Sequence, residues 1–199
     1  MRATRPVPPS ARAVLYAAPG VLLALTGLFH PAVLTYPTSG RWTVVHAIGL
    51  FLVPLVGVAL AEMVWNDRSP LARTVVLGSF VYATGYTALD ALEGVGAGYV
   101  TYRLGPGAAR SPAVDYLVDI GNALGSLGVL GLLAATIAMA ALAGRRGGMR
   151  ALAPAALLVV ASLSFLDSHF DPWRGVLTVL AIGIATGWLA LIVVPRDLG

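Results

Sequence analysis

Residues 43–65 read TVVHAIGLFLVPLVGVALAEMVW, a run that is almost wholly apolar. A helix needs about 20 residues to cross the ~30 Å hydrocarbon layer of a bilayer, and this run is long enough to do so. Its one acidic residue, Glu62, lies near one end, and its histidine, His46, lies near the other. The run therefore predicts a membrane-spanning helix with a histidine close to one membrane surface.

The rest of the chain has the same character. Of its 199 residues 58% are hydrophobic and 11% are charged, whereas soluble domains are about 25% charged. Five further apolar runs approach spanning length, at residues 13–29, 74–99, 116–143, 151–166 and 176–194. We therefore predict an all-α integral membrane protein: a single domain over residues 1–199, built as a six-helix bundle that crosses the cell membrane several times.

Arginine supplies all of the basic side chains and falls unevenly between the two ends of the predicted helices. By the positive-inside tendency, the end richer in arginine faces the cytoplasm, which places both termini there. That end carries Arg2, Arg5, Arg12, Arg68, Arg73, Arg145, Arg146, Arg150 and Arg196, and the other carries Arg41, Arg103, Arg110 and Arg174. Since these arginines lie in separate loops, they form no patch suited to nucleic acid, and we predict no nucleic-acid partner.

Glycine and tryptophan positions predict how the helices pack. Glycines four residues apart allow helices to approach closely inside a membrane bundle. Such pairs occur at Gly94 and Gly98, at Gly121 and Gly125, and at Gly183 and Gly187. Tryptophan is enriched where a helix meets the membrane surface, so Trp42 and Trp173 are expected at the outer interface and Trp65 at the inner one.

Polar and ionisable side chains gather at the outer end. Counting 1.5 Å of rise per residue from the nearest inner arginine, His30, His46, Asp90 and Asp167 lie roughly 26–33 Å up their helices. They come from four different predicted helices and so share one layer near the outer edge of the hydrocarbon. At or just above this layer lie Glu93, Asp119, Asn122 and His169.

The predicted helix over residues 74–99 indicates which way its polar side chains point. Five polar side chains recur on it at spacings of 3, 4, 4 and 3 residues, which places them on one face: Ser79, Tyr82, Tyr86, Asp90 and Glu93. Because polar groups are costly in lipid, this face is expected to point into the bundle. We predict an outward-facing cavity lined by the helices over 74–99, 116–143 and 151–166 and capped by the two histidine-bearing loops.

The first chemistry that fits such a cavity is acid–base catalysis. Asp90 and Glu93 are the candidate acid and base, His46 is a proton partner, and the hydroxyls of Tyr82 and Tyr86 orient the substrate. A carboxylic acid that is kept protonated by apolar surroundings can protonate or isomerise a lipid-like or isoprenoid substrate. Membrane lipids and an amphipathic small molecule are therefore the predicted partners.

Two cofactors stay open as alternatives. Candidate ligands for a divalent metal ion such as zinc, whose bound water supports hydrolysis, are His30, His46, Asp90, Glu93 and Asp167. The histidines are also candidate haem ligands. Since the chain has no cysteine, thiolate metal sites are excluded, and no H-E-x-x-H, G-x-S-x-G or phosphate-binding glycine motif is present.

Transport requires polar groups along a whole path through the membrane. The middle and inner parts of the predicted helices offer few of them, mainly Thr84, Thr136, Thr186 and Glu62. We therefore place a membrane-embedded enzyme first. A small-molecule or ion transporter, a haem-binding protein and an accessory subunit of a membrane complex remain alternatives.

Overall fold

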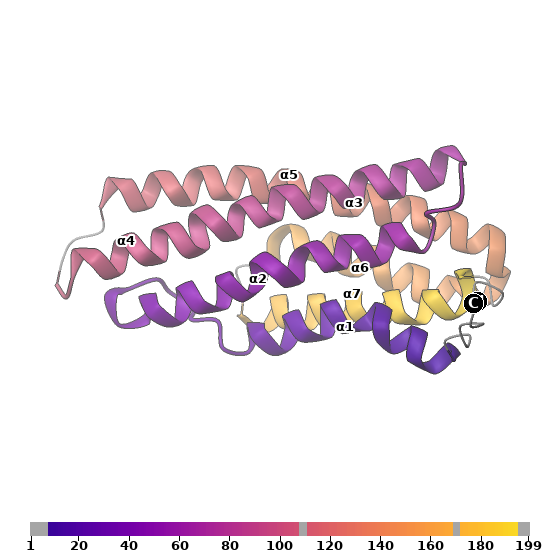
Figure 1. The fold of residues 1–199 in the computed structure, drawn as a ribbon, viewed down its shortest axis with the longest axis horizontal. Coiled ribbons are helices and arrows are strands. Elements are labelled where there is room, and N and C mark those ends of the chain that lie inside the picture. Colours follow the sequence, from indigo (N-terminus) through magenta and orange to yellow (C-terminus); the bar gives the residue numbers. More distant parts are fainter. Residues whose placement is uncertain (1–7, 108–110, 169–171, 195–199) are drawn as a thin grey trace, which may run out of the picture.

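A computed structural model describes residues 8–107, 111–168 and 172–194, and these residues form helices joined by short connections (Figure 1). The elements are α1 (Pro9–Gly27), α2 (Tyr36–Glu62), α3 (Pro70–Leu89), the π-helix η1 (Asp90–Gly96), α4 (Ala97–Leu104), α5 (Pro112–Gly147), the 3-10 turn η2 (Gly148–Ala151), α6 (Leu152–Ser168) and α7 (Pro172–Val193). No strand occurs within these ranges, which confirms the all-α class.

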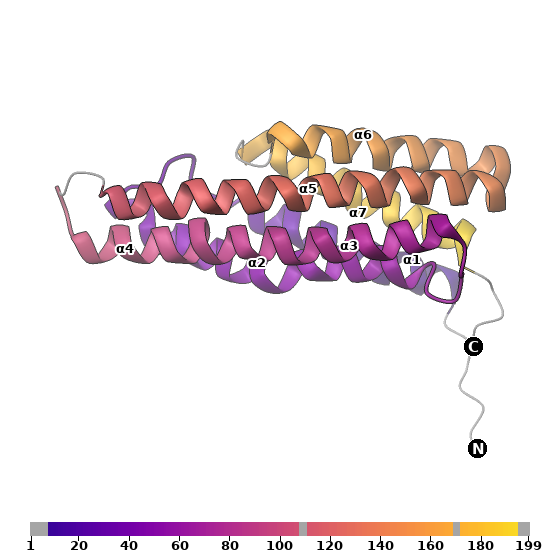
Figure 2. The ribbon, with the colours of Figure 1, turned by 90° about the horizontal axis from the view of Figure 1, so that it is seen from above.

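Five helical stretches of the described chain are long and apolar enough to cross a membrane. One of them, Pro112–Ser168, contains both α5 and α6. Between these helices the chain turns at Gly148, whose φ of 56° is in the region that favours glycine. As a result α6 runs back beside α5 (Figures 1 and 2).

Proline sets the helix starts, which differ from those expected from hydropathy. Proline is favoured in the first helical turn, where its missing N–H needs no partner and its fixed φ suits the helix. It occupies that turn in α1, α2, α3 and α5, and α7 begins at Pro172. The expected start at residue 43 is therefore wrong by two turns, because Thr35 precedes α2 as its N-cap and forms a capping box with Thr38 in the first turn.

The helices form two closely packed pairs, and α2 and α6 each pack against both pairs. The continuous rod from α3 through η1 to α4 packs along α5 (Figure 2), and α1 packs along α7 (Figure 1). The rod spans 35 residues and α5 spans 36, so each is roughly 50 Å long. Both project beyond the ends of α1, α6 and α7 as a two-helix extension (Figure 1), against which α2 packs by stacking Tyr36 on Tyr102.

Glycines are the points of closest approach inside these pairs. A Cβ on Gly20 of α1 would lie 2.6 Å from Cα of Gly183 on α7, and one on Gly187 would lie 2.6 Å from the carbonyl oxygen of Ala13. The glycine pairs singled out in the sequence likewise face neighbouring helices, which confirms that they serve packing within the bundle.

The two ends of the described chain meet at one end of the bundle, here called the arginine end. Arg12 of α1 donates to the carbonyl oxygen of Val194, just beyond α7. Asp67, in the connection from α2 to α3, forms an ion pair with Arg146 of α5. Hydrogen bonds from Ser69, first of all from its backbone N–H, and the Arg146 guanidinium lower the pKa of Asp67, so the carboxylate is charged at neutral pH.

Candidate functional site

The candidate site is built around η1, the π-helical stretch within the long rod. Insertions of this kind widen the helical turn and recur at functional sites. Here the stretch carries Asp90 at its first position and Glu93 three residues later, and the two side chains are 5% and 4% exposed. Ser79, Tyr82 and Tyr86 are also buried, so the polar stripe lies inside the bundle as predicted.

Trp42 of α2 holds η1 in place. Its indole Nε1 donates a hydrogen bond of 3.1 Å to the backbone carbonyl oxygen of Glu93. The side chain is 7% exposed, so near the start of α2 Trp42 packs against other helices and does not face lipid or headgroups. Trp65 and Trp173, by contrast, are 70% and 71% exposed.

The rings of His30, in the connection after α1, and of Trp42 and His46, on α2, form one cluster. The ring centroids lie 4.8 Å apart for His30 and Trp42, 4.9 Å for Trp42 and His46, and 5.0 Å for the two histidines. His46 was expected near the start of the helix predicted over residues 43–65, but it lies well inside α2 because that helix begins at Tyr36. The sequence therefore brings the two imidazoles together across a shorter connection than expected.

The tautomer of His46 follows from its hydrogen bond. Nδ1 lies 2.9 Å from the carbonyl oxygen of Trp42. Because a carbonyl oxygen can only accept, Nδ1 carries the hydrogen, and Nε2 of the neutral ring keeps its lone pair. His46 can therefore act as a base through Nε2.

His30 is half-buried in the connection between α1 and α2. Burial lowers its pKa, a hydrogen bond with the backbone of Pro31 partly offsets this, and the positive charge of Arg41 lowers it further. With its pKa below the ordinary value of about 6.5, His30 is a neutral imidazole at pH 7.

Two glycines let α2 and η1 approach each other at the polar side chains. A Cβ on Gly49 would lie 2.5 Å from Oδ2 of Asp90, and a Cβ on Gly94 would overlap the His46 ring. Each glycine thus makes room for a titratable side chain of the other element. Larger residues at either position would push Asp90 and His46 out of their present places.

A cavity of about 100 Å³ opens beside these side chains. It is lined by α1, the connection after it, α2, α3, η1, the end of α6 and the start of α7, and its polar lining comprises Thr26, His30, His46, Tyr82, Tyr86 and Asp90. Glu93 is buried next to this group but does not line the cavity. The cavity therefore joins residues that are up to 156 positions apart in the chain, from Leu23 to Val179 (179 − 23).

Asp90 is the distinctive group of this cavity. Its Oδ2 is buried and has no hydrogen-bond partner among the described residues. A buried charge without a partner is very costly. The carboxyl group must therefore either carry its proton or share the cavity with a positive charge.

The expected lining by α5 and α6 is only partly observed. From α6 only Phe165 reaches the cavity, and no residue of α5 does. On α5, Asp119 is exposed and Asn122 is half-buried, because that helix turns its small residues, such as Gly121 and Gly125, toward the rod. His169 lies outside the described residues.

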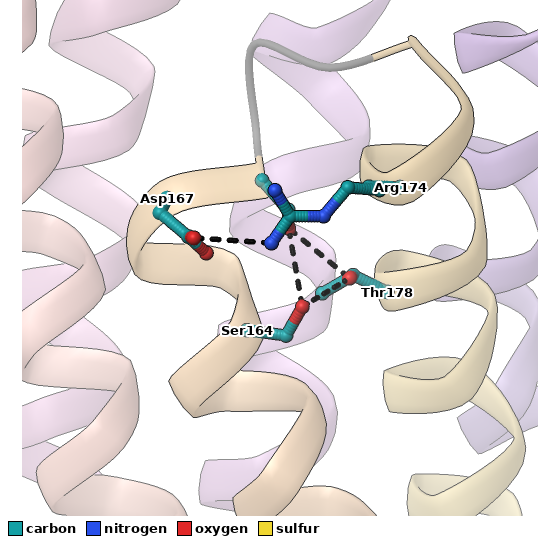
Figure 3. A network of polar contacts seen from close by, with 5 residues as sticks. Ser164, Asp167, Arg174 and Thr178 are labelled. Atoms are coloured by element: carbon teal, nitrogen blue, oxygen red, sulfur yellow. Dashed lines mark hydrogen bonds and ion pairs between the residues drawn. The ribbon is translucent and has the colours of Figure 1, made fainter.

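Asp167 is a further correction. Its side chain is 67% exposed and forms an ion pair of 3.0 Å with Arg174 at the top of α7, away from the cavity (Figure 3). Beneath this pair the hydroxyls of Ser164, Ser168 and Thr178 lie 3.0–3.5 Å from one another. The polar residues near the end of α6 therefore link α6 to α7 through hydrogen bonds and an ion pair, and they do not line the cavity.

This hydroxyl cluster carries a stability prediction. Thr178→Val keeps the shape of the side chain but leaves the Ser164 and Ser168 hydroxyls without their shared partner, so we expect a loss of about 1–2 kcal/mol. The melting temperature of the purified protein should fall by a few degrees. Thr84→Val is the matched control, because the exposed Thr84 hydroxyl bonds only to carbonyls of its own helix; equal shifts in both variants would contradict the role of the cluster.

The geometry does not fit the two cofactors considered from the sequence. No group of three or more histidine, aspartate or glutamate side chains among the described residues is placed to hold a metal ion. The His30 and His46 rings contact each other directly, whereas ligation of haem by two histidines requires the iron between them. A cavity of about 100 Å³ is also well below the ~300–1,000 Å³ of pockets for large ligands.

Several residues of the site were not predicted from the sequence to belong to it. Trp42 precedes His46 by four residues and therefore shares its helical face. This spacing could have indicated that Trp42 lies beside His46 in the site. Gly49, three residues after His46, follows the same face. Phe165 carries no such signal, because its place beside Tyr82 and Tyr86 depends on how α6 packs.

A second, larger cavity of about 700 Å³ lies at the arginine end. Its lining includes Arg12, Tyr16, Glu62, Asp67 and Arg146. Between the two cavities α2 and α7 carry buried apolar side chains, among them Val56 and Leu60 on α2 and Ile182 and Leu189 on α7. No residue lines both cavities.

Comparison with known proteins finds no relative of this chain. No protein-family profile matches the chain, and neither curated proteins nor solved structures give a match.

Proposed function

We propose that the chain crosses the cell membrane six times, with α6 as a separate crossing and both termini in the cytoplasm. The reversal of the chain between α5 and α6 and the arginine bias support this arrangement. In this orientation the two-helix extension and the first cavity lie toward the outer face.

We propose further that the first cavity is the active site of a small membrane-embedded enzyme that performs acid–base chemistry on a lipid-like substrate. Asp90 is the general acid, His46 is the base through Nε2, and Tyr82 and Tyr86 orient the reacting group. Glu93, buried beside them, supports Asp90 without lining the cavity. No metal or haem is part of this proposal.

One observation carries the proposal: a buried carboxyl oxygen of Asp90 without a partner among the described residues lines the same cavity as a histidine of defined tautomer. A purely structural polar residue would normally satisfy its hydrogen bonds within the protein. An unsatisfied acid beside a base in one cavity is what proton transfer to and from a substrate requires.

The proposal is tested by following solvent deuterium into lipids. The purified protein is incubated in D2O with extracts of bacterial polar lipids and of isoprenoids, and the products are analysed by mass spectrometry. Protonation of a carbon atom by Asp90 would place deuterium in one lipid class, and Asp90→Asn, which removes the acid, should lower the rate by at least about 100-fold.

The matched control is Asp167→Asn, which removes an exposed carboxylate outside the cavity and should label lipids at the wild-type rate. If no lipid class gains deuterium with the wild-type protein, or if Asp90→Asn labels as fast as wild type, the enzyme proposal is wrong.

A second candidate, transport, is favoured by the second cavity at the arginine end, because a carrier needs sites that are reached from both sides of the membrane. Proteoliposomes with a pH-sensitive dye inside would then show protein-dependent proton movement that Asp90→Asn abolishes. The absence of such movement leaves the enzyme as the remaining proposal.

A further inference from the structure

We propose that the group recognised in the first cavity is a small amine, which enters as the uncharged base, takes the proton of Asp90 and is held as an ammonium beside the resulting carboxylate. This inference rests on the proposed function of Asp90 as an acid and deepens it by naming the substrate class: an amphipathic molecule with an amine head. The ammonium–carboxylate pair is the binding state, and the N–H proton returns to Asp90, re-forming its O–H bond, before Asp90 can protonate a carbon atom.

The buried carboxyl group is the first element of this site. Asp90 is 5% exposed, lines the cavity, and has an oxygen without a hydrogen-bond partner among the described residues. An ammonium group offers the charge and the N–H donors that this oxygen lacks, and charge-assisted hydrogen bonds of this kind are about twice as strong as neutral ones. The occupant that best completes the site is therefore a cation with N–H groups.

Aromatic rings are the second element. Tyr82 and Tyr86 of α3 and Phe165 of α6 line the cavity and contact one another, with centroids 5.2 Å apart for Tyr86 and Phe165 and 5.8 Å for the tyrosines. A round cavity of about 100 Å³ is roughly 3 Å in radius, so a cation inside it lies within the ~6 Å over which aromatic rings attract positive charge. These rings favour an organic cation over a hydrated inorganic ion.

The volume limits the size of the head group. A cavity of about 150 Å³ can hold benzene, so the present cavity of about 100 Å³ takes an amine with only a few carbon atoms. The remainder of a larger substrate would have to lie outside the cavity.

Charge balance explains why the amine would be taken up as the free base. An ammonium ion is costly in hydrocarbon, whereas the neutral amine is not. In the cavity the O–H bond of Asp90 breaks and an N–H bond of the ammonium forms, with no other bond changed and no net charge brought into the membrane. The other titratable groups around Asp90 are His30, His46, Tyr82, Tyr86 and Glu93, and no arginine is among the residues that line the cavity.

The test measures ligand stabilisation of the detergent-purified full chain. Melting temperature is followed by intrinsic tryptophan fluorescence in increasing ethylammonium chloride, with potassium chloride as the salt control, ethanol as the uncharged control and tetrabutylammonium chloride as the oversized control. A ligand that binds only the folded state stabilises it in a saturable way, so ethylammonium should raise the melting temperature by several degrees while the three controls do not.

Two variants locate the effect. Asp90→Asn should abolish the ethylammonium shift, and Asp167→Asn should retain it in full. If ethylammonium acts like potassium chloride on the wild-type protein, or if its shift persists in Asp90→Asn, amine recognition at this cavity is overturned. The deuterium experiment decides the proposed function separately, since lipid labelling without an ethylammonium shift removes only the amine as substrate class.

Discussion

Gly20→Val should destabilise the protein by about 3 kcal/mol, at the upper end of what overpacking usually costs. The added side chain would begin 2.6 Å from Cα of Gly183 and 2.9 Å from the carbonyl oxygen of Val179. These are backbone atoms, so α1 and α7 can only move apart. Differential scanning fluorimetry in detergent should show a melting temperature roughly 6–12 °C lower than wild type.

The control for this variant is Gly40→Val on α2. Gly40 is also helical, and an added Cβ meets nothing within 4 Å there. Because valine has a higher helix propensity than glycine, Gly40→Val should melt at or slightly above the wild-type temperature. Equal melting temperatures for the two variants would show that α1 and α7 do not pack through their glycines.

Trp42→Ala is the second change with a large expected effect, about 3–5 kcal/mol, because it removes a large buried side chain and leaves a cavity. The same change removes the donor to the carbonyl oxygen of Glu93 and the ring that contacts both His30 and His46. We therefore expect η1 to lose its fixed geometry, and lipid labelling or ligand stabilisation that depends on Asp90 to disappear even below the melting temperature.

Trp42→Phe separates packing from hydrogen bonding, since it keeps most of the ring and loses the N–H donor. We expect it to lose about 1–3 kcal/mol and to weaken the Asp90-dependent readouts. Trp65→Ala, at a position that is 70% exposed, should leave both stability and readouts near wild type. A fully functional Trp42→Ala would contradict the role assigned to this side chain.

Spacing along the sequence predicted which residues of the rod are buried, because a helical face is a local property. The stripe from Ser79 to Glu93 lies inside the bundle as expected. The π-helix η1, which begins at Asp90 near the end of the stripe, could not be predicted in this way. Its wider turn is associated with the contact of Glu93 with Trp42, which comes from a different helix.

Depth along a helix proved a weaker guide than helical face. Asp90 and Asp167 were placed at the same height, yet Asp90 is buried in the cavity and Asp167 is paired with Arg174 at the surface. A count of residues gives the height of a side chain but not the direction in which it points. For α6, whose residues are apolar on nearly all sides, packing against α5 and α7 decides that direction.

Helix ends were misjudged for a related reason. Hydropathy located the apolar part of each helix and missed the polar turns at either end, such as the start of α2 at Tyr36. Proline and a preceding serine or threonine mark these starts locally, as at Ser69 before Pro70 and Ser111 before Pro112. These local signals mark the starts of α3 and α5 more closely than hydropathy does.

The two-helix extension also offers a practical route to imaging. At 20.5 kDa the protein is small for single-particle electron cryomicroscopy, where images of so little mass are hard to align. A rigid fusion partner spliced between Leu104 and Pro112 would continue both helices and stand clear of the detergent belt. Such a fiducial would leave the cavity near Asp90 untouched and would let a bound ligand be seen directly.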